Sequence, residues 1–216
     1  DTTYAQPRLV RGVDDGTAVA FAWVKNASFS GVDYSEIMMN LLYLSDLETP
    51  ADPITLLVAG ATNREATQPV LLRLEDSDRI VCAWHENHLI EGGSPKRWIR
   101  FAIVEPLPGS SSDNSLYVTL SASLVDGEHG ALGRPSLAPL ADGGFLVAWE
   151  HQDESAATAR VRWRRFDAGG ATVKTAAYVA SQNAGSQRMP ALGVTEEEEV
   201  FLIWLAVSID RIGWNE

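Results

Sequence analysis

Residues 134–149 read RPSLAPLADGGFLVAW, and this stretch contains the pattern that decides the fold. An apolar run begins at Pro135, an acidic and glycine-rich turn follows at residues 141–144, and a second apolar run ends at Trp149. Two apolar runs joined by such a turn are typical of a β-hairpin. The stretch therefore predicts two adjacent antiparallel strands.

The same pattern occurs at three other places in the chain. Each copy starts at a proline, continues through an acidic or glycine-rich turn, and ends in an apolar strand closed by a tryptophan. Internal repetition of this kind indicates a repeat architecture. The prolines of the further copies are Pro7, Pro69 and Pro190, and their tryptophans are Trp23, Trp84 and Trp204.

Each copy continues into further strands. A third strand carries a second tryptophan in three copies, at Trp98, Trp163 and Trp214, so that all seven tryptophans occupy repeat positions. In the first copy we predict the third strand at residues 35–44, although their Met and Leu content would also suit a helix. A fourth strand is predicted at residues 54–58, 116–124 and 173–179.

These repeats predict an all-β fold, a β-propeller of four-stranded antiparallel blades. The repeat units span approximately residues 1–62, 63–127, 128–182 and 183–216, and the last one lacks its fourth strand. We expect one propeller or propeller fragment over residues 1–216, either a closed four-bladed ring or an arc of a larger propeller. In the ring, residues 1–6 would supply the closing strand; in the arc, which we favour, further blades or a partner chain complete the last blade.

Two segments of the third unit carry a resemblance to a known group of proteins. ADGGFLVAW at residues 141–149 and RFDAGG at residues 165–170 resemble the repeat of large secreted bacterial proteins that form propeller blades. The resemblance is weaker in the second unit, and in the first and fourth units it is limited to the positions of the proline, the turn and the tryptophan. It implies a propeller fold and an extracellular or periplasmic location, and it supplies no catalytic residues. The Asp-box of sialidase-type propellers is absent from the sequence.

Charge and composition exclude several classes of partner. The formal net charge is −12, whereas nucleic-acid binders need a basic face to neutralise phosphates. The longest apolar run, residues 200–207, is far shorter than a membrane-spanning helix requires. We therefore expect neither nucleic-acid binding nor membrane insertion.

The single cysteine, Cys82, lies in an apolar run and predicts a buried, inert thiol. Because the chain starts with Asp rather than Met, we expect it to be processed or part of a longer protein.

One face of the propeller is expected to carry long loops, because the connections between second and third strands and between blades emerge on the same side. All four histidines, His85, His88, His129 and His151, map to that face in the second and third units. Two interpretations are open: the histidines lie close enough to bind one metal ion or one substrate, or they are separate, solvated loop residues. Their spacing matches no zinc signature, so the sequence leaves any metal or cofactor open. The loops are predicted at residues 25–36, 86–96 and 152–159 within units and at 62–67, 126–133 and 181–187 between them.

Acidic residues accompany these histidines. They would offer an acid–base pair or calcium ligands, or they lie near one another by chance in an acidic chain. The residues concerned are Glu86, Glu128, Glu150, Asp153 and Glu154.

Two arginines lie beside repeat prolines at the start of inner strands. Arg134 and Arg188 occupy the places that Gln6 and Gln68 hold in the first two units. They either hold a carboxylate or sulfate of an acidic ligand or bond backbone carbonyls of the neighbouring blade. The tryptophans, because they recur inside apolar strands, indicate packing between blades rather than stacking on sugars.

No nucleophile elbow, phosphate loop, dinucleotide fingerprint or CxxC pair occurs in the sequence. We therefore expect a noncatalytic extracellular or periplasmic module that presents its loop-rich face to a protein or glycan. One alternative is a carbohydrate-active hydrolase or lyase acting on an acidic polysaccharide through the histidine and carboxylate loops. Another is a structural subunit of a larger assembly, whose open blade a partner completes by strand addition.

Overall fold

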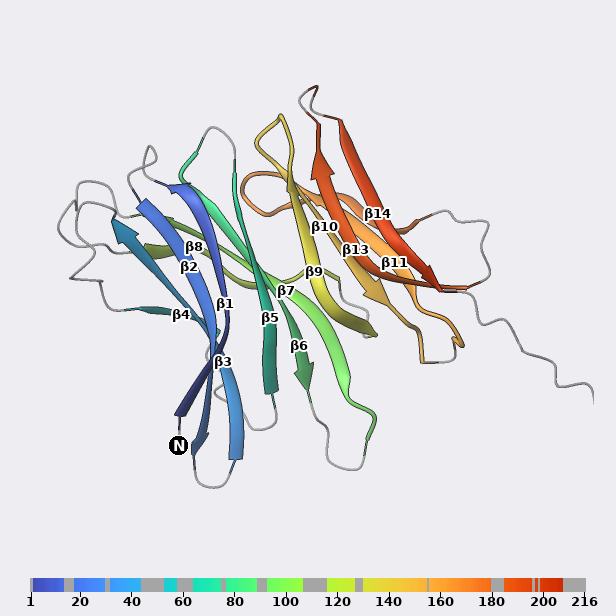
Figure 1. Ribbon diagram of the computed structural model, residues 1–216, viewed down its shortest axis with the longest axis horizontal. Helices are drawn as coiled ribbons and strands as arrows, with labels where there is room; N and C mark the ends of the chain where they lie inside the picture. Colours follow the sequence, from blue (N-terminus) through green and yellow to red (C-terminus); the bar gives the residue numbers. More distant parts are fainter. Residues whose placement is uncertain are drawn as a thin grey trace, which may run out of the picture.

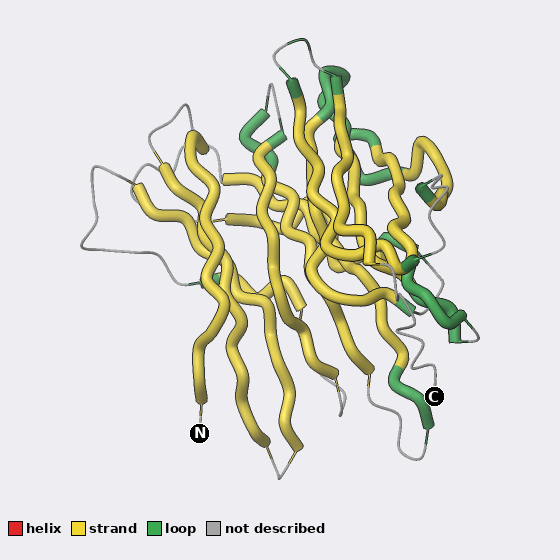
Figure 2. Tube along the Cα trace, turned by 45° about the vertical axis from the view of Figure 1, so that its right-hand side comes forward, coloured by secondary structure: helices red, strands yellow, loops and turns green. Residues whose placement is uncertain are grey.

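The computed structural model is all-β and is built of propeller blades (Figure 1). It describes residues 2–13, 18–29, 32–43, 53–57, 64–74, 77–88, 93–106, 116–126, 130–154, 156–179, 185–195, 197 and 199–207. These residues form three four-stranded antiparallel sheets and one two-stranded sheet, and their strand order follows the sequence within each sheet. Every element drawn in Figure 2 is a strand or a loop. In the described part of the chain, no helix is long and apolar enough to cross a membrane.

The four sheets are four successive blades. Blade 1 contains β1 (Thr2–Val13), β2 (Ala18–Phe29), β3 (Val32–Tyr43) and β4 (Ile54–Leu57). Blade 2 contains β5 (Arg64–Arg73), β6 (Ile80–His88), β7 (Lys96–Pro106) and β8 (Leu116–Leu124). Blade 3 contains β9 (Ala131–Pro139), β10 (Phe145–His151), β11 (Arg160–Phe166) and β12 (Thr172–Tyr178). Blade 4 is described as β13 (Ser186–Val194) and β14 (Val200–Val207). The fold class predicted from the repeats is therefore confirmed.

The glycine-rich motifs of the third unit form the turns that the repeat requires. Asp142 accepts a hydrogen bond from the backbone N–H of Gly144 at 3.1 Å, and Gly143 adopts φ 78°. Asp167 likewise accepts two backbone N–H bonds in its own turn, where Gly170 has φ 84°. An Asp that bonds its own turn and a glycine at positive φ are the two local devices of tight hairpins.

The hydrophobic core lies between blades, and the second strand of each blade has two distinct faces. The face that carries the repeat tryptophan packs on the preceding blade: Trp84 lies in a cluster with blade 1, and Trp149 in a cluster with blade 2. Both indoles are fully buried, at 0% and 1% exposure. In blades 1 and 2 the opposite face receives the next blade, with Ala20 at this interface in blade 1 and Ala83 in blade 2. The predicted role of these tryptophans in blade packing is confirmed for Trp84 and Trp149.

The inner strands β1, β5, β9 and β13 lie side by side in that order (Figure 1). In Figure 1, blade 1 and blade 4 lie at opposite ends of this row, so the described residues form an arc. The prediction that residues 1–6 would complete the last blade and close a ring is wrong for the residues of this segment that the structure describes. Thr2–Ala5 begin β1 and pair with Val24–Ala27 of β2 in the same blade. Trp214 and the predicted third strand of the last unit lie outside the described residues.

Several segments predicted as loops are strand ends. β2 extends as far as Phe29 and β3 begins at Val32. Within the segment predicted as a loop, Lys25 therefore pairs directly with Glu36 in the sheet. Their side chains also form a salt bridge of 2.8 Å. The long polar hairpin of blade 1 therefore projects as paired strands, because cross-strand partners hold polar residues that propensity alone assigns to loops. The single cysteine, Cys82, is buried in β6, and burial raises the pKa of its thiol, as the sequence predicted.

Candidate functional site

A bulge interrupts the inner strand of each blade beside the repeat proline. Gln6, Gln68 and Met189 each directly precede this proline and have φ angles of 55°, 56° and 52°. In blade 3, Gly133 takes the left-handed conformation with φ 63°. Non-glycine residues rarely adopt this region, and such strain concentrates at functional sites. Proline is tolerated at a bulge because the ladder does not need its missing N–H.

Side chains of neighbouring blades hold the bulges in place. The backbone N–H of Gln68 donates a short hydrogen bond to Oε1 of Gln6 in blade 1. The backbone N–H of Met189 donates to Oε1 of Glu150 in blade 3 at 2.7 Å. The strained backbone is thus fixed across two blade boundaries.

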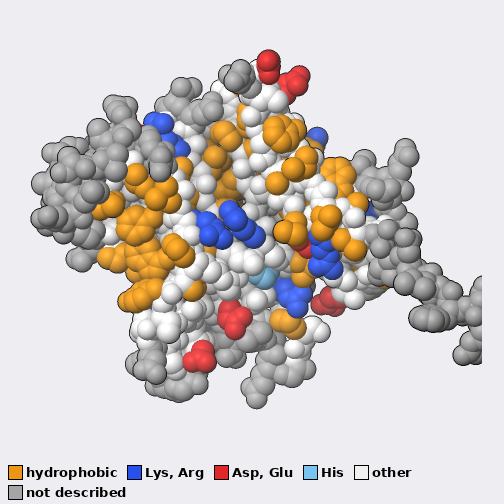
Figure 3. Space-filling model, viewed as in Figure 1, with side chains coloured by type: hydrophobic (Ala, Val, Ile, Leu, Met, Phe, Trp, Pro, Cys, Tyr) orange, Lys and Arg blue, Asp and Glu red, His pale blue; other side chains and the backbone are white. Residues whose placement is uncertain are grey.

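The bulges border a groove on the exposed face of the inner strands. The groove has a volume of about 630 Å³ and is lined by residues of blades 2, 3 and 4. This volume lies within the range of small-molecule sites. On this face, Figure 3 shows Lys and Arg side chains gathered in the middle, with hydrophobic side chains on either side. The lining residues that matter most below are Gln68, Gly133, Arg134, Glu150 and Met189.

Arg134, which lines the groove, has no carboxylate partner among the described residues. Partial burial, followed by the nearby charge of Arg8 on β1, lowers the pKa of the Arg134 guanidinium. Among the described residues, no carboxylate forms a salt bridge with Arg8 or Arg134. In the part of the chain that the structure describes, Nε of Arg8 is buried without a hydrogen-bond partner, and Nη1 donates to the carbonyl oxygen of Pro7 at 2.8 Å. Two like charges therefore lie close enough to interact, one of them in the groove and the other on β1, without a described counterion.

Arg188, the second arginine that the sequence predicted as a ligand-binding residue, has a carboxylate partner within the protein. Arg188 lies 3.4 Å from Oε2 of Glu150, the carboxylate that also fixes the bulge at Met189. Its charge is therefore neutralised within the protein. The sequence singled out Arg134 and Arg188, whereas the structure places Arg8 near Arg134. The signal that would have found Arg8 is its place in the repeat, directly after Pro7 in an inner strand.

The described histidines occupy strands. His85 is buried at 7% exposure, and its Nε2 lies 3.1 Å from the carbonyl oxygen of Ala131 in blade 3. His151 is 1% exposed, pairs with Ala131 in the sheet, and lies 3.0 Å from Asp153 Oδ1. His88 stands beside Trp98, with ring centroids 6.2 Å apart. The structure thus places His85 and His151 around Ala131, and His129 lies outside the described residues.

We expect His85 to make stability depend on pH. Burial lowers the pKa of its imidazole in the folded state, so the unfolded chain binds a proton more readily. As pH falls below about 6.5, the ordinary histidine pKa, the free energy of unfolding should therefore decrease. The measurement is urea unfolding at pH 7.5 and 5.5 for the wild type and His85→Gln. The variant should lose part of this dependence, and an identical slope in both proteins would contradict the assignment.

Three of the acidic residues near the histidines form contacts within the protein, whereas the fourth described one, Glu154, is exposed. Glu86 is fully buried, with Oε2 2.8 Å from Arg100 Nε and Oε1 3.8 Å from Arg64 Nη1. The carboxylate of Asp153 accepts hydrogen bonds from His151 and from the Tyr178 hydroxyl group. These hydrogen bonds, that of His151 above all, lower the pKa of Asp153. Glu128 lies outside the described residues. Within the described ranges, no group of three or more His, Cys, Asp or Glu side chains could hold a metal ion.

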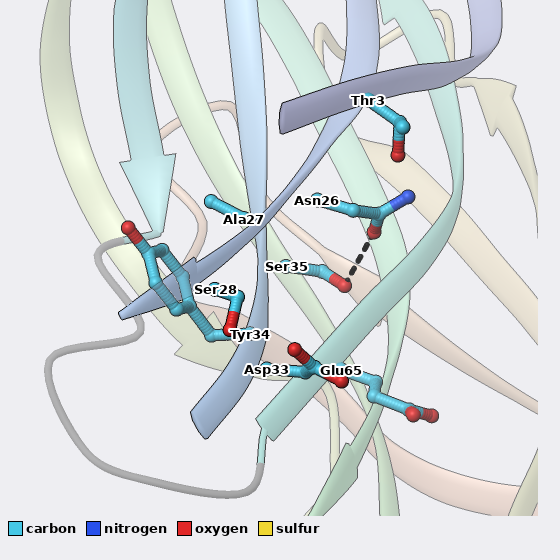
Figure 4. Close-up of a pocket in the computed structure, with 8 residues that line it drawn as sticks. All are labelled: Thr3, Asn26, Ala27, Ser28, Asp33, Tyr34, Ser35 and Glu65. Carbon is cyan, nitrogen blue, oxygen red and sulfur yellow. Dashed lines mark hydrogen bonds between the residues drawn. The ribbon is translucent and has the colours of Figure 1, made fainter. Parts of the chain in front are cut away.

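A second, polar cavity of about 590 Å³ lies at the strand ends of blades 1 and 2 (Figure 4). Ser35 donates a hydrogen bond of 2.7 Å to Oδ1 of Asn26 across β2 and β3. Figure 4 shows Asp33 of β3 and Glu65 of β5 bordering the same space, whereas the Tyr34 ring points away from this pair. Two carboxylates, Asp33 and Glu65, are therefore among the residues that line this cavity.

Comparison with known proteins finds structural likeness without a family. No protein-family model matches the chain, and no curated protein matches it. A solved protein of unknown function from Dyadobacter fermentans is similar in structure, with a TM-score of 0.56 and 10% sequence identity over 93% of this chain. An N-acetylgalactosamine deacetylase from F. plautii, solved with blood group B trisaccharide, gives a TM-score of 0.44, 12% identity and 91% coverage. The chain spans 56% of the length of each of these proteins. At such identities the likeness concerns the fold alone.

Proposed function

We propose that the chain is a noncatalytic binding module whose inner-strand groove holds an anionic group of an acidic glycan or protein. The observation that carries the proposal is Arg134, which lines a groove of about 630 Å³, interacts with the like charge of Arg8, and has no carboxylate partner among the described residues. Guanidinium groups bind carboxylate and sulfate through charge-assisted, geometrically defined hydrogen bonds. The two arginines act together on one anionic group, because a ligand anion would relieve their mutual repulsion.

The fixed bulges favour binding without a large rearrangement. The hydrogen bonds of Gln68 to Gln6 and of Met189 to Glu150 hold the groove walls before a ligand arrives. A preformed site loses less conformational entropy on binding. Leu71 and Leu137 line the same groove and offer apolar contact for the uncharged part of the ligand.

The carbohydrate-active enzyme alternative loses support at two of the predicted carboxylates, Glu86 and Glu150. Glu86 is held by two arginines, and Glu150 by the Met189 backbone and Arg188. A general acid or base must reach the substrate with a free carboxyl group. We therefore retain the binding module, with an extracellular or periplasmic location as part of the proposal.

The test is calorimetric titration with a galacturonate oligomer, its methyl ester and a polyglutamate peptide. The free acid should bind and the ester should not, and the peptide distinguishes a protein ligand from a glycan. Arg134→Gln should weaken binding of the acid about tenfold, the value of one charge-assisted hydrogen bond. The matched control is Arg165→Gln, an exposed arginine paired with Asp142, which should leave the affinity unchanged. Equal binding of acid and ester, or equal loss in both variants, would refute the proposal.

A further inference from the structure

The outer face of blade 4 is an exposed apolar stripe. Phe201, Ile203, Leu205 and Val207 alternate along β14 and are 46%, 59%, 54% and 39% exposed. Alternate residues of a strand point to the same side, so the four side chains form one continuous surface. Contiguous apolar patches rimmed by polar residues mark interaction sites.

The equivalent positions in the interior blades are covered. Counted from the repeat tryptophan, Phe201 and Ile203 correspond to Val81 and Ala83 of blade 2, which are both 0% exposed. In blade 2 this face lies under blade 3, whose own tryptophan face supplies Phe145, Val147 and Trp149. The stripe on blade 4 is therefore the receiving half of a blade interface, and the occupant that fits it is a tryptophan-bearing blade face.

Such a face lies at the other end of the same molecule, where no blade of the described residues packs on it. In blade 1 the buried side of β2, with Ala20 and Ala22, packs on blade 2. Phe21 and Trp23 point to the opposite side, where their rings stack with centroids 5.2 Å apart. Both are only partly buried, whereas the residues at the Trp23 position in blades 2 and 3, Trp84 and Trp149, are fully buried, as are those at the Phe21 position, Cys82 and Val147.

We infer that two copies of this chain associate head to tail, the Phe21 and Trp23 face of one covering the β14 stripe of the other. Two arcs of four blades complete an eight-bladed ring in this way, which is within the usual range of propellers. A head-to-tail contact that closes in a ring is self-limiting, so the assembly stops at the dimer. The β14 side of the contact adds no charge repulsion, because residues 200–207 contain no ionisable side chain despite the net charge of −12.

Sedimentation velocity over about two decades of protein concentration tests this inference, since association obeys mass action. The wild type should show a reversible monomer–dimer equilibrium. Ile203→Glu blocks the receiving face and Phe21→Glu blocks the tryptophan face, and each should weaken association about tenfold or more. The control is Val173→Glu, a 54% exposed valine on β12, which should not change it. Circular dichroism verifies that all the variants are folded.

Mixing the two blocked variants gives the sharpest result. Ile203→Glu retains an intact tryptophan face and Phe21→Glu an intact receiving face, so the mixture should form dimers that neither variant forms alone. A mixture that stays monomeric would overturn the pairing of these two faces. A wild type that is monomeric at every concentration would overturn the inference. It would instead favour a longer polypeptide whose further blades cover the β14 stripe. Growth beyond the dimer would overturn the closed ring.

Discussion

Trp149→Ala is expected to lower the free energy of unfolding by about 3 to 5 kcal/mol, the usual cost of removing a buried large aromatic side chain. Trp149 is 1% exposed and packs between blades 2 and 3 with Phe145 and Val147. Arg162 also stands over its ring, 5.8 Å from the centroid. The truncation leaves a cavity that the rigid strands on either side cannot close. Urea unfolding monitored by fluorescence measures the effect.

Trp23→Ala provides the matched control, because Trp23 holds the same repeat position in the uncovered blade 1. In dilute, monomeric protein its removal should cost less than half as much, since water already reaches the indole. Equal losses in the two variants would show that position in the repeat, rather than coverage by the neighbouring blade, determines the stability.

Glu86→Ala is expected to be comparably destabilising, by about 3 to 5 kcal/mol, because removing one partner of a buried ion pair leaves the other charge unpaired. Glu86 is fully buried and its Oε2 lies 2.8 Å from Arg100 Nε. Thermal unfolding at neutral pH measures the loss.

The double variant Glu86→Leu with Arg100→Leu should recover part of that stability. Both charges are then removed together, and well-packed apolar residues replace a buried pair at little cost. The exposed pair of Arg73 and Asp78 offers the comparison, since their separation is 3.4 Å and about a third of each side chain is exposed. Asp78→Ala should change the stability by less than about 1 kcal/mol. A small effect of Glu86→Ala would contradict the structural role of this carboxylate.

The fold was predictable because its signals are local and repeated. Proline, turn and tryptophan recur in each unit, and the glycines of residues 141–144 and 167–170 form the turns that their chemistry requires. Strand lengths were less predictable. The polar pairs of β2 and β3, such as Lys25 with Glu36, extend a hairpin that sequence propensity assigned to a loop.

The site was only partly predictable, because its geometry depends on contacts between blades. The sequence pointed to Arg134, which the structure places in the groove. It could not show that Glu150 pairs with Arg188 across a blade boundary, or that the charge of Arg8 on β1 acts on Arg134. The positive φ of Gln6, Gln68 and Met189 was also invisible, since no residue preference favours it there.

The central claim is that Arg8 and Arg134 together hold one anionic group, and a double-mutant cycle tests it most directly. The affinities of the wild type, Arg8→Gln, Arg134→Gln and the double variant for the galacturonate oligomer are compared at one salt concentration. If the two arginines act on the same group, the losses are not additive, and the double variant should bind hardly more weakly than either single variant. Strictly additive losses, or unchanged affinity in either single variant, would contradict the claim.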